Sequence, residues 1–126
     1  MKCIANQLVR ALDWMKRSRV IHCDLKPENV LLCSKSSSWV KLIDFGTGCN
    51  EDEICFTYVQ SRYYRAPEVI LGMKYTCSID MWSFGCLLLE FHVGYPVFAG
   101  EDECDQIAIL MEYLGVPPKS MLMVSE

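Results

Sequence analysis

The sequence predicts an α+β fold that is mainly helical and contains one short β-hairpin. Three stretches carry this prediction: an amphipathic pattern over residues 2–18, two β-type runs at 30–32 and 39–43, and a strongly apolar run at 79–91. With 126 residues, the chain is long enough for one hydrophobic core and too short for two domains. We therefore treat residues 1–126 as one structural unit.

The first stretch predicts an amphipathic helix. Apolar residues recur every three to four positions, at Ile4, Leu8, Leu12 and Met15, with polar residues between them. This spacing places the four side chains on one helix face. We expect a helix over residues 2–18 that packs against the core and supports the segment after it.

The next two runs predict a β-hairpin. Residues 30–32 and 39–43 are rich in β-branched, aromatic and other apolar side chains, and four of the five residues at 34–38, in the linker between them, are serine. A hairpin of this length would place Asn29 at its entrance and Asp44 at its exit. Both side chains could then face one metal ion.

The second half of the chain predicts three helices. Apolar residues show no periodic spacing from 47 to 61, which indicates an exposed loop. A short helix with proline in its first turn is expected at 67–71. The run at 79–91 is apolar nearly all round, so we expect a helix from Cys77 or Ser78 to near Gly94, buried on most sides at the centre of the domain. The last helix begins at Asp102 or Glu103 and ends at Leu114, before Gly115 and a proline pair.

Charge and hydropathy exclude two classes of partner. The net charge is −4, the pI is about 5.2, and no basic stripe is present, so we expect no nucleic-acid partner. No apolar stretch reaches the roughly eighteen residues of a membrane span, and no secretory signal follows Met1. We expect no membrane association.

The eight cysteines have neither the close spacing of a zinc knuckle nor a disulfide-like pattern. Several lie in apolar runs, where a thiol behaves as a small buried side chain. We expect reduced core thiols in a cytoplasmic or nuclear compartment. The cysteines are Cys3, Cys23, Cys33, Cys49, Cys55, Cys77, Cys86 and Cys104.

Residues 21–32 form the most informative stretch. Asp24, Lys26 and Asn29 lie between two apolar pairs, which suits a loop held rigidly on a core. In such a loop an aspartate can accept a hydroxyl proton and an asparagine can hold a metal ion. Asp44 supplies a second carboxylate two residues before a glycine.

These residues resemble the signatures of the protein kinases. His-Cys-Asp-Leu with a following asparagine, then Asp-Phe-Gly and Ala-Pro-Glu, is similar to the kinase catalytic loop, D-F-G and A-P-E motifs. His-Cys-Asp together with Tyr-x-Gln-Ser-Arg-x-Tyr-Arg-Ala-Pro-Glu resembles one CMGC branch, the dual-specificity tyrosine-regulated (DYRK) kinases. The resemblance implies that residues 1–126 are a partial kinase domain, the mainly helical large (C-terminal) lobe.

The resemblance implies ATP and Mg²⁺ as cofactors and assigns roles to five residues. Asp24 would orient the substrate hydroxyl and accept its proton, and Lys26 would lie beside the transferred phosphate. Asn29 and Asp44 would ligate magnesium, which prefers such oxygen ligands. Gly46 would give the backbone freedom to turn after Asp44.

The resemblance also implies a regulatory tyrosine. Tyr58 matches the activation-loop tyrosine that these kinases phosphorylate on themselves, while Phe56 replaces its companion. Cys23 stands where most kinases carry an arginine that binds the activation-loop phosphate. Arg62 and Arg65 are therefore the expected readers of a phosphorylated Tyr58.

Four further residues are expected to be structural or without a role. Asp80 would accept hydrogen bonds from the backbone around His22 and Cys23, and His22 would orient the loop. Glu68 would pair with an arginine beyond this chain, and His92 would lie on the surface.

Parts of a kinase are missing from this sequence. No glycine-rich loop, strand lysine or partner glutamate precedes the catalytic loop, so we expect the small lobe to be absent and to be a required partner. The last helices of the large lobe are also expected to be absent. Two interpretations follow: a fragment of an active kinase, inactive alone, or a noncatalytic kinase-lobe binding module.

The expected substrates are proteins with serine or threonine followed by proline and with basic residues upstream, as the resemblance implies. An acidic cluster could favour basic peptides. It could equally be the solvated start of a helix, where carboxylates complement the helix dipole. The cluster consists of Glu101, Asp102, Glu103 and Asp105.

Overall fold

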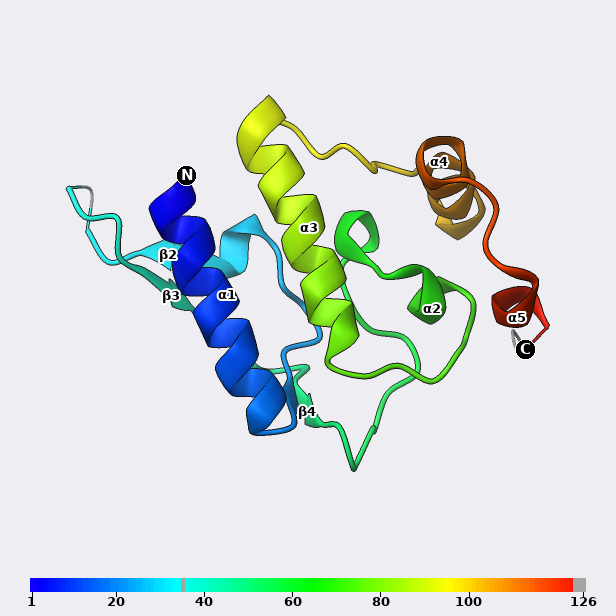
Figure 1. The fold of residues 1–126 in the computed structure, drawn as a ribbon, viewed down its shortest axis with the longest axis horizontal. Coiled ribbons are helices and arrows are strands. Elements are labelled where there is room, and N and C mark those ends of the chain that lie inside the picture. Colours follow the sequence, from blue (N-terminus) through cyan, green and yellow to red (C-terminus); the bar gives the residue numbers. More distant parts are fainter. Residues whose placement is uncertain (35, 124–126) are drawn as a thin grey trace.

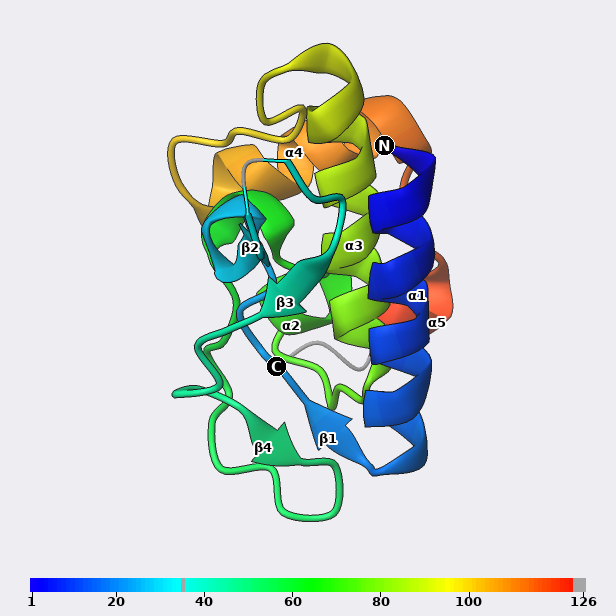
Figure 2. The ribbon, with the colours of Figure 1, turned by 90° about the vertical axis from the view of Figure 1, so that its left-hand side faces the viewer.

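The computed structural model of the chain describes residues 1–34 and 36–123. Two long helices form the centre of the fold. α1 (Lys2–Arg17) and α3 (Ser78–Val93) lie side by side, as both views show (Figures 1 and 2). α2 (Pro67–Ile70), α4 (Glu103–Leu114) and α5 (Lys119–Leu122) lie on the other side of α3 from α1 (Figure 1).

α1 confirms the amphipathic prediction. Leu8, Leu12 and Met15 are buried, and Ile4 is partly buried. They pack with α3 and the loop before the hairpin in one apolar cluster, whose other buried members are Leu25, Phe84 and Leu87. α1 therefore supports the segment that carries Asp24.

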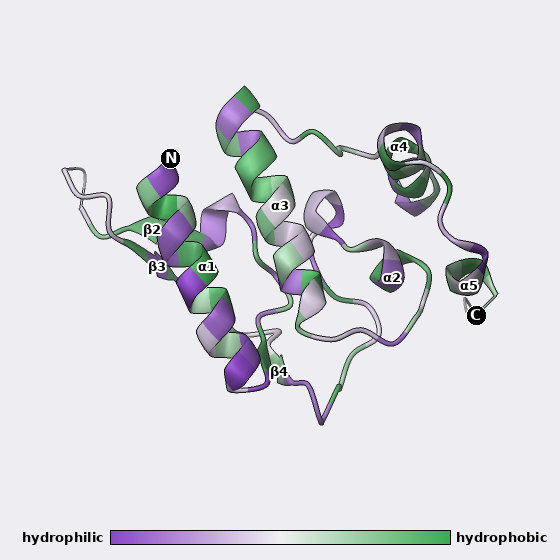
Figure 3. Ribbon diagram, viewed as in Figure 1, coloured by the Kyte–Doolittle hydropathy of each residue, from purple (hydrophilic) through white to green (hydrophobic). Residues whose placement is uncertain are grey.

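α3 has the predicted bounds but a more open face than predicted. It ends at Gly94, whose left-handed backbone (φ 90°) donates a hydrogen bond to the Glu90 carbonyl. Its residues are mostly apolar (Figure 3), yet Met81 and Leu89 are 49% and 43% exposed. The prediction of burial on most sides was wrong for this face, because no described residues cover it. The buried residues of α3 are Ile79, Asp80, Ser83, Phe84, Cys86 and Leu87.

The predicted hairpin is present. β2 (Val30–Leu32) pairs antiparallel with β3 (Val40–Leu42), with Val30 opposite Leu42. Lys35 of the predicted linker lies outside the described residues.

A second sheet was not predicted. β1 (Val20–Ile21) pairs antiparallel with β4 (Cys49–Asn50). β4 lies in the region, residues 47–61, that was expected to be a loop. Two-residue strands are too short to show a period of two in the sequence. This pairing holds the segment after the D-F-G motif against the strand that leads into Asp24.

The short helix at 67–71 and the last helix are confirmed. Asp102 caps α4 by accepting a hydrogen bond from the Asp105 backbone, and Asp105 accepts one from Glu101. These contacts favour the helix-start interpretation of the acidic cluster. α5 was not predicted.

We expect Gly100→Ala to destabilise the chain. A Cβ atom at Gly100 would lie 2.5 Å from the backbone nitrogen of Gln106 on α4, and the Gly100 N–H already donates to Gln106 Oε1 at 2.9 Å. Displacing a packed helix backbone costs about 1–3 kcal/mol. Urea unfolding measures the loss, and Gly85→Ala is the control, because Gly85 has no positive φ and its Cβ would meet nothing within 4 Å. An unchanged midpoint for Gly100→Ala would contradict the prediction.

All eight cysteines are free thiols, but the prediction of core burial holds for only some of them. Cys23 and Cys86 are buried, Cys49 and Cys77 are partly buried, and the other four are exposed. Burial raises the pKa of the Cys86 thiol to about 12 and that of Cys77 to about 11. Within the described residues, no helix has the length and apolar character needed to cross a membrane.

Candidate active site

Asp24 lies at the centre of a compact polar cluster. Its Oδ1 accepts hydrogen bonds from the Ser61 N–H at 3.1 Å and the Ser61 hydroxyl at 2.7 Å, and its Oδ2 accepts one from Lys26 Nζ at 2.7 Å. Burial favours the protonated form, but the bonds from Lys26 and Ser61 outweigh it and lower the pKa of Asp24 below its ordinary value of 3.8. Asp24 is thus an ionised, oriented carboxylate at neutral pH.

Lys26 and Ser61 complete this cluster from two distant segments. Lys26 Nζ also donates to the Ser61 hydroxyl at 3.1 Å, and the hydrogen bond to Asp24 raises the pKa of Lys26. The structure brings together Asp24 and Lys26, both of which are predicted site residues, and adds Ser61, which the sequence analysis missed. Its only sequence signal was its place in the Gln-Ser-Arg stretch before Ala-Pro-Glu.

The loop that carries Asp24 is fixed to α3 by Asp80, as predicted. Asp80 Oδ2 accepts the His22 N–H at 2.7 Å, and Oδ1 accepts the Cys23 N–H at 3.1 Å. All three residues are buried, and Cys23 has a left-handed backbone (φ 64°). Two oxygens of one side chain therefore hold two successive amides of a strained turn.

His22 orients the loop, which confirms its predicted structural role. Its Nδ1 accepts the Asp24 N–H at 3.2 Å, so the neutral ring carries its proton on Nε2 and donates to the Ile43 carbonyl at 2.9 Å. The ring also packs against Phe45, with centroids 4.5 Å apart. His22 thus links Asp24 directly to the residues on either side of Asp44. His92, by contrast, is exposed, as predicted.

Asn29 and Asp44 flank the hairpin. Asn29 is buried, and its Nδ2 donates to the Asp24 carbonyl at 2.8 Å, while its backbone carbonyl accepts the Ile43 N–H at 3.0 Å. Asp44 is exposed and left-handed (φ 63°). The backbone thus brings the entrance and exit of the hairpin together.

The donor set at this position fits magnesium. The Asn29 amide nitrogen is already bonded, which leaves its oxygen as the atom able to ligate a cation, and Asp44 adds a carboxylate. Magnesium is commonly held by one or two such protein oxygens together with waters and substrate phosphates. Among the described residues, no group of three or more His, Cys, Asp or Glu side chains could hold a metal by itself.

The turn after Asp44 differs from the prediction. The left-handed residue is Asp44 itself, and Gly46 has no positive φ. A Cβ at Gly46 would instead lie 3.2 Å from Asp44 Oδ1. Gly46 therefore brings its N–H within 3.4 Å of the Asp44 carboxylate without using the positive φ that glycine allows.

Arg65 lies beside Tyr58, whereas Arg62 contacts a different segment. The Arg65 guanidinium carbon is 4.1 Å from the centre of the exposed Tyr58 ring. Arg65 also pairs with Glu103 at 2.9 Å. Arg62 donates to the carbonyl of Glu101 at 2.6 Å, and its Nε is buried with no hydrogen-bond partner among the described residues.

Cys23 and Glu68 complete the set of predicted residues. Cys23 is fully buried, its Sγ is 3.7 Å from Cys49 Sγ, and burial raises the pKa of its thiol strongly. It therefore packs in the core and cannot bind a phosphate. Glu68 accepts a hydrogen bond from Ser78 at 3.4 Å and has no ion pair within the described part of the chain.

A groove of about 370 Å³ lies beside the polar cluster. Two carboxylates, Glu28 and Glu90, line it, and Glu90 accepts the Tyr64 hydroxyl at 2.6 Å. Burial and Glu90 together raise the pKa of Tyr64, so its hydroxyl stays protonated. The other lining residues are Lys26, Ser61, Arg62, Tyr63 and Pro96.

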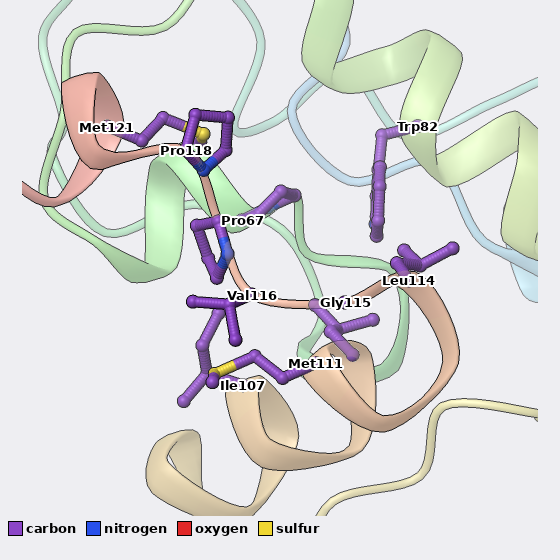
Figure 4. Close-up of a pocket in the computed structure, with 11 residues that line it drawn as sticks. Pro67, Trp82, Ile107, Met111, Leu114, Gly115, Val116, Pro118 and Met121 are labelled. Carbon is purple, nitrogen blue, oxygen red and sulfur yellow. The ribbon is translucent and has the colours of Figure 1, made fainter.

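A second, apolar pocket of about 160 Å³ lies away from these motifs. It is formed where α2, α4 and the segment leading to α5 approach Trp82 of α3 (Figure 4). Its lining is mainly apolar and includes none of the predicted site residues. This pocket is therefore separate from the Asp24 cluster.

A loop that presents an oriented aspartate and a lysine, with an amide and a carboxylate at the two ends of the adjoining hairpin, is the arrangement expected of a phosphoryl-transfer enzyme. A family model for the protein kinase domain matches residues 1–121. The chain therefore belongs to the protein kinase family, and within it the chain is DYRK-like.

Three relatives illustrate this similarity. The chain is 52% identical over 120 residues to dual specificity tyrosine-phosphorylation-regulated kinase 2 of Drosophila melanogaster, which covers 95% of this chain and 17% of that protein. It is 55% identical over 118 residues to dual specificity tyrosine-phosphorylation-regulated kinase mbk-2 of Caenorhabditis elegans, a match that covers 94% of this chain and 14% of that protein. It is 52% identical over 121 residues to the DYRK-family kinase pom1 of Schizosaccharomyces pombe, a match that covers 96% of this chain and 11% of that protein. The chain spans about one sixth or less of the length of these relatives.

Proposed function

We propose that this chain supplies the catalytic and activation segments of a kinase that transfers the ATP γ-phosphate to serine or threonine hydroxyls of proteins. The observation that carries the proposal is the Asp24 cluster, in which Lys26 and Ser61 fix an ionised carboxylate. Asp24 accepts the proton of the substrate hydroxyl, and Lys26 lies where it can neutralise charge on the transferred phosphate. Asn29 and Asp44 would hold magnesium, which would neutralise negative charge on the nucleotide phosphates.

We propose that the substrate residue after the phosphorylated one is proline. The Gln60 carbonyl accepts two hydrogen bonds from Arg65, at 3.2 and 2.7 Å, directly before Ser61. It is thus not free to accept an N–H from a bound peptide. A substrate amide buried there without an acceptor would lose free energy, and proline has no such amide.

The groove beside Lys26 supports a preference for basic residues upstream. Glu28 and Glu90 place two carboxylates along it, and their charge complements an arginine or lysine of a peptide.

Tyr58 is the proposed site of autophosphorylation. Its ring is 65% exposed, and the Arg65 guanidinium already lies against it. The buried Nε of Arg62 has no partner among the described residues, so it is a donor that a phosphate could engage after rearrangement. We also propose a cytoplasmic or nuclear location, which the eight free thiols support.

The glycine-rich loop and strand lysine of this kinase would come from a further part of the protein. We therefore expect the 126-residue chain alone to bind ATP very weakly and to show no useful turnover. The assay is phosphate transfer from labelled ATP to a Ser-Pro peptide. Transfer by the purified chain, at a rate lost on Asp44→Ala, would contradict this expectation.

The kinase proposal itself is tested by reading the transcript upstream of the Met1 codon and expressing the longest in-frame product. Transfer by that product, lost on Asp44→Ala, is the expected result. An upstream stop codon, together with protein of the short size in cells, would contradict it and favour a noncatalytic binding module.

A further inference from the structure

A glutamine of α1 holds the outer edge of the hairpin. The Cys33 N–H donates to the Trp39 carbonyl at 2.9 Å, so the backbone groups of Trp39 face β2. Those of Val40 therefore face away from β2, along an edge that pairs with no further strand in the described part of the chain. The side chain of Gln7 covers this edge: its Oε1 accepts the Val40 N–H at 3.2 Å, and its Nε2 donates to the Ser38 carbonyl at 2.7 Å.

The Gln7 amide thus takes the place of a third strand. A strand edge presents unpaired N–H and carbonyl groups, and a primary amide can satisfy both kinds because it has one acceptor and two donor hydrogens. Gln7 Nε2 also donates to the Cys3 carbonyl at 3.2 Å, one turn earlier in α1. Because backbone groups alternate in direction along a strand, a shift of β3 by one residue would break the bonds to Val40 and Ser38 together. Gln7 therefore fixes β3 along its own axis.

The rest of the hairpin gives this position little support. Each strand has three residues, and residues 33–39 join them in a loop too long to set the register as a two-residue turn does. Val40 and Leu42 are partly buried against the apolar cluster of α1, and Lys41 between them is exposed. This packing selects the face of β3 that lies on α1. The Gln7 amide adds directional bonds, which apolar contacts do not supply.

β3 leads directly into the proposed magnesium site. The Ile43 N–H donates to the Asn29 carbonyl at 3.0 Å, and the Ile43 carbonyl accepts from His22 Nε2 at 2.9 Å. Asp44 follows at once, with its left-handed backbone. The place of the Asp44 carboxylate relative to Asn29 therefore depends on where β3 lies along β2.

We infer that Gln7 is a positioning residue for the magnesium site, because by fixing the edge of β3 it sets the place of Asp44 relative to Asn29. The inference rests on the proposed kinase function, in which these two residues would hold the ion. Residues that orient metal ligands without touching the metal typically change metal affinity about 10–100-fold. Gln7 acts through the backbone from residue 40 to residue 44, so we expect an effect at the lower end of this range.

Gln7→Met tests the inference in the longest in-frame product that contains this chain. Methionine is similar in size to glutamine but has no donor and only a weak acceptor. The probe is Mn²⁺ alone, with the free ion measured by electron paramagnetic resonance, and we expect its dissociation constant to rise about tenfold. Gln7→Glu should give a smaller rise, because a carboxylate still accepts from Val40 but cannot donate to Ser38.

Gln106→Met is the matched control. Gln106 of α4 also bonds two backbone groups with its amide, accepting the Gly100 N–H at 2.9 Å and donating to the Phe98 carbonyl at 3.1 Å. It should lose stability with unchanged Mn²⁺ affinity. If Gln7→Met binds Mn²⁺ as the wild type does while Asp44→Ala does not bind, the inference is overturned and the kinase proposal stands. A wild type without Asp44-dependent binding would overturn the proposed magnesium site and the inference with it.

Amide hydrogen exchange gives a second readout that needs neither metal nor turnover. In Gln7→Met we expect the amides of Val40 and Ile43 both to exchange at least about tenfold faster, with no change at Ile43 in Gln106→Met. Faster exchange at Val40 with unchanged exchange at Ile43 would show that Gln7 covers a strand edge without positioning the segment of Asp44. That result would overturn the inference whatever the kinase activity.

Discussion

Replacing Asp80 by alanine is expected to lower the free energy of unfolding by about 2–5 kcal/mol. The change removes the acceptors of the His22 and Cys23 amides, both of which are buried. An unpaired buried N–H costs about 1–3 kcal/mol, and here two are left in a turn that is already left-handed. Since whole domains are stable by only about 5–15 kcal/mol, this is a large fraction of the total.

Urea unfolding measures the loss, and amide hydrogen exchange at His22 and Cys23 localises it. Asp13→Ala is the matched control, because Asp13 forms an exposed ion pair with Arg17 at 2.7 Å and should matter by less than about 1 kcal/mol. Equal stability of Asp80→Ala and Asp13→Ala would show that Asp80 does not anchor the loop.

Asp80→Asn separates the charge of Asp80 from its hydrogen bonds. Burial raises the pKa of Asp80, and the bonds from His22 and Cys23 only partly oppose this effect. The folded state then binds more protons than the unfolded state above the unfolded pKa of about 3.9, so this group's contribution to stability falls as pH rises toward its folded pKa. Asparagine keeps one acceptor and no charge, so it should show a smaller loss than alanine and lack this pH dependence.

The sequence predicted the long elements and the residues of the site but not how the site is held. The bounds of α1, α3 and α4 followed from apolar spacing, caps and glycines, all of which are local signals. The pairing of β1 with β4 and the contact of Ser61 with Asp24 join segments about 30 to 40 residues apart. No local pattern encodes such contacts.

The left-handed residues show the same limit. A glycine predicts freedom to turn, yet Cys23, Asp44 and Gln60 take the positive φ values in and around the site. Two of them are held there by contacts from elsewhere: Asp80 holds Cys23, and Ser83 and Arg65 hold Gln60. Strain at such positions is typical of functional sites and becomes visible only when the surrounding side chains are placed.

Asp24→Asn is expected to lower kcat about 10²–10⁴-fold in the longest active product. Asparagine has nearly the same shape and can still accept from Ser61, so the loop geometry should persist. It cannot accept a proton from the substrate hydroxyl, and it removes the negative partner that raises the pKa of Lys26. The loss should therefore lie in kcat, with little change in the KM for ATP, because Asn29 and Asp44 are untouched.

The matched control is Asp52→Asn, which removes another ion-paired carboxylate, 2.6 Å from Arg19 in an exposed loop, and should leave kcat unchanged. Unfolding curves of both variants must overlay that of the wild type for the comparison to report on chemistry. If Asp24→Asn retains kcat within about twofold, proton acceptance by this carboxylate does not contribute to the rate. A fall in kcat with the ATP KM preserved would instead show that Asp24 stabilises the transition state and does not act in nucleotide binding.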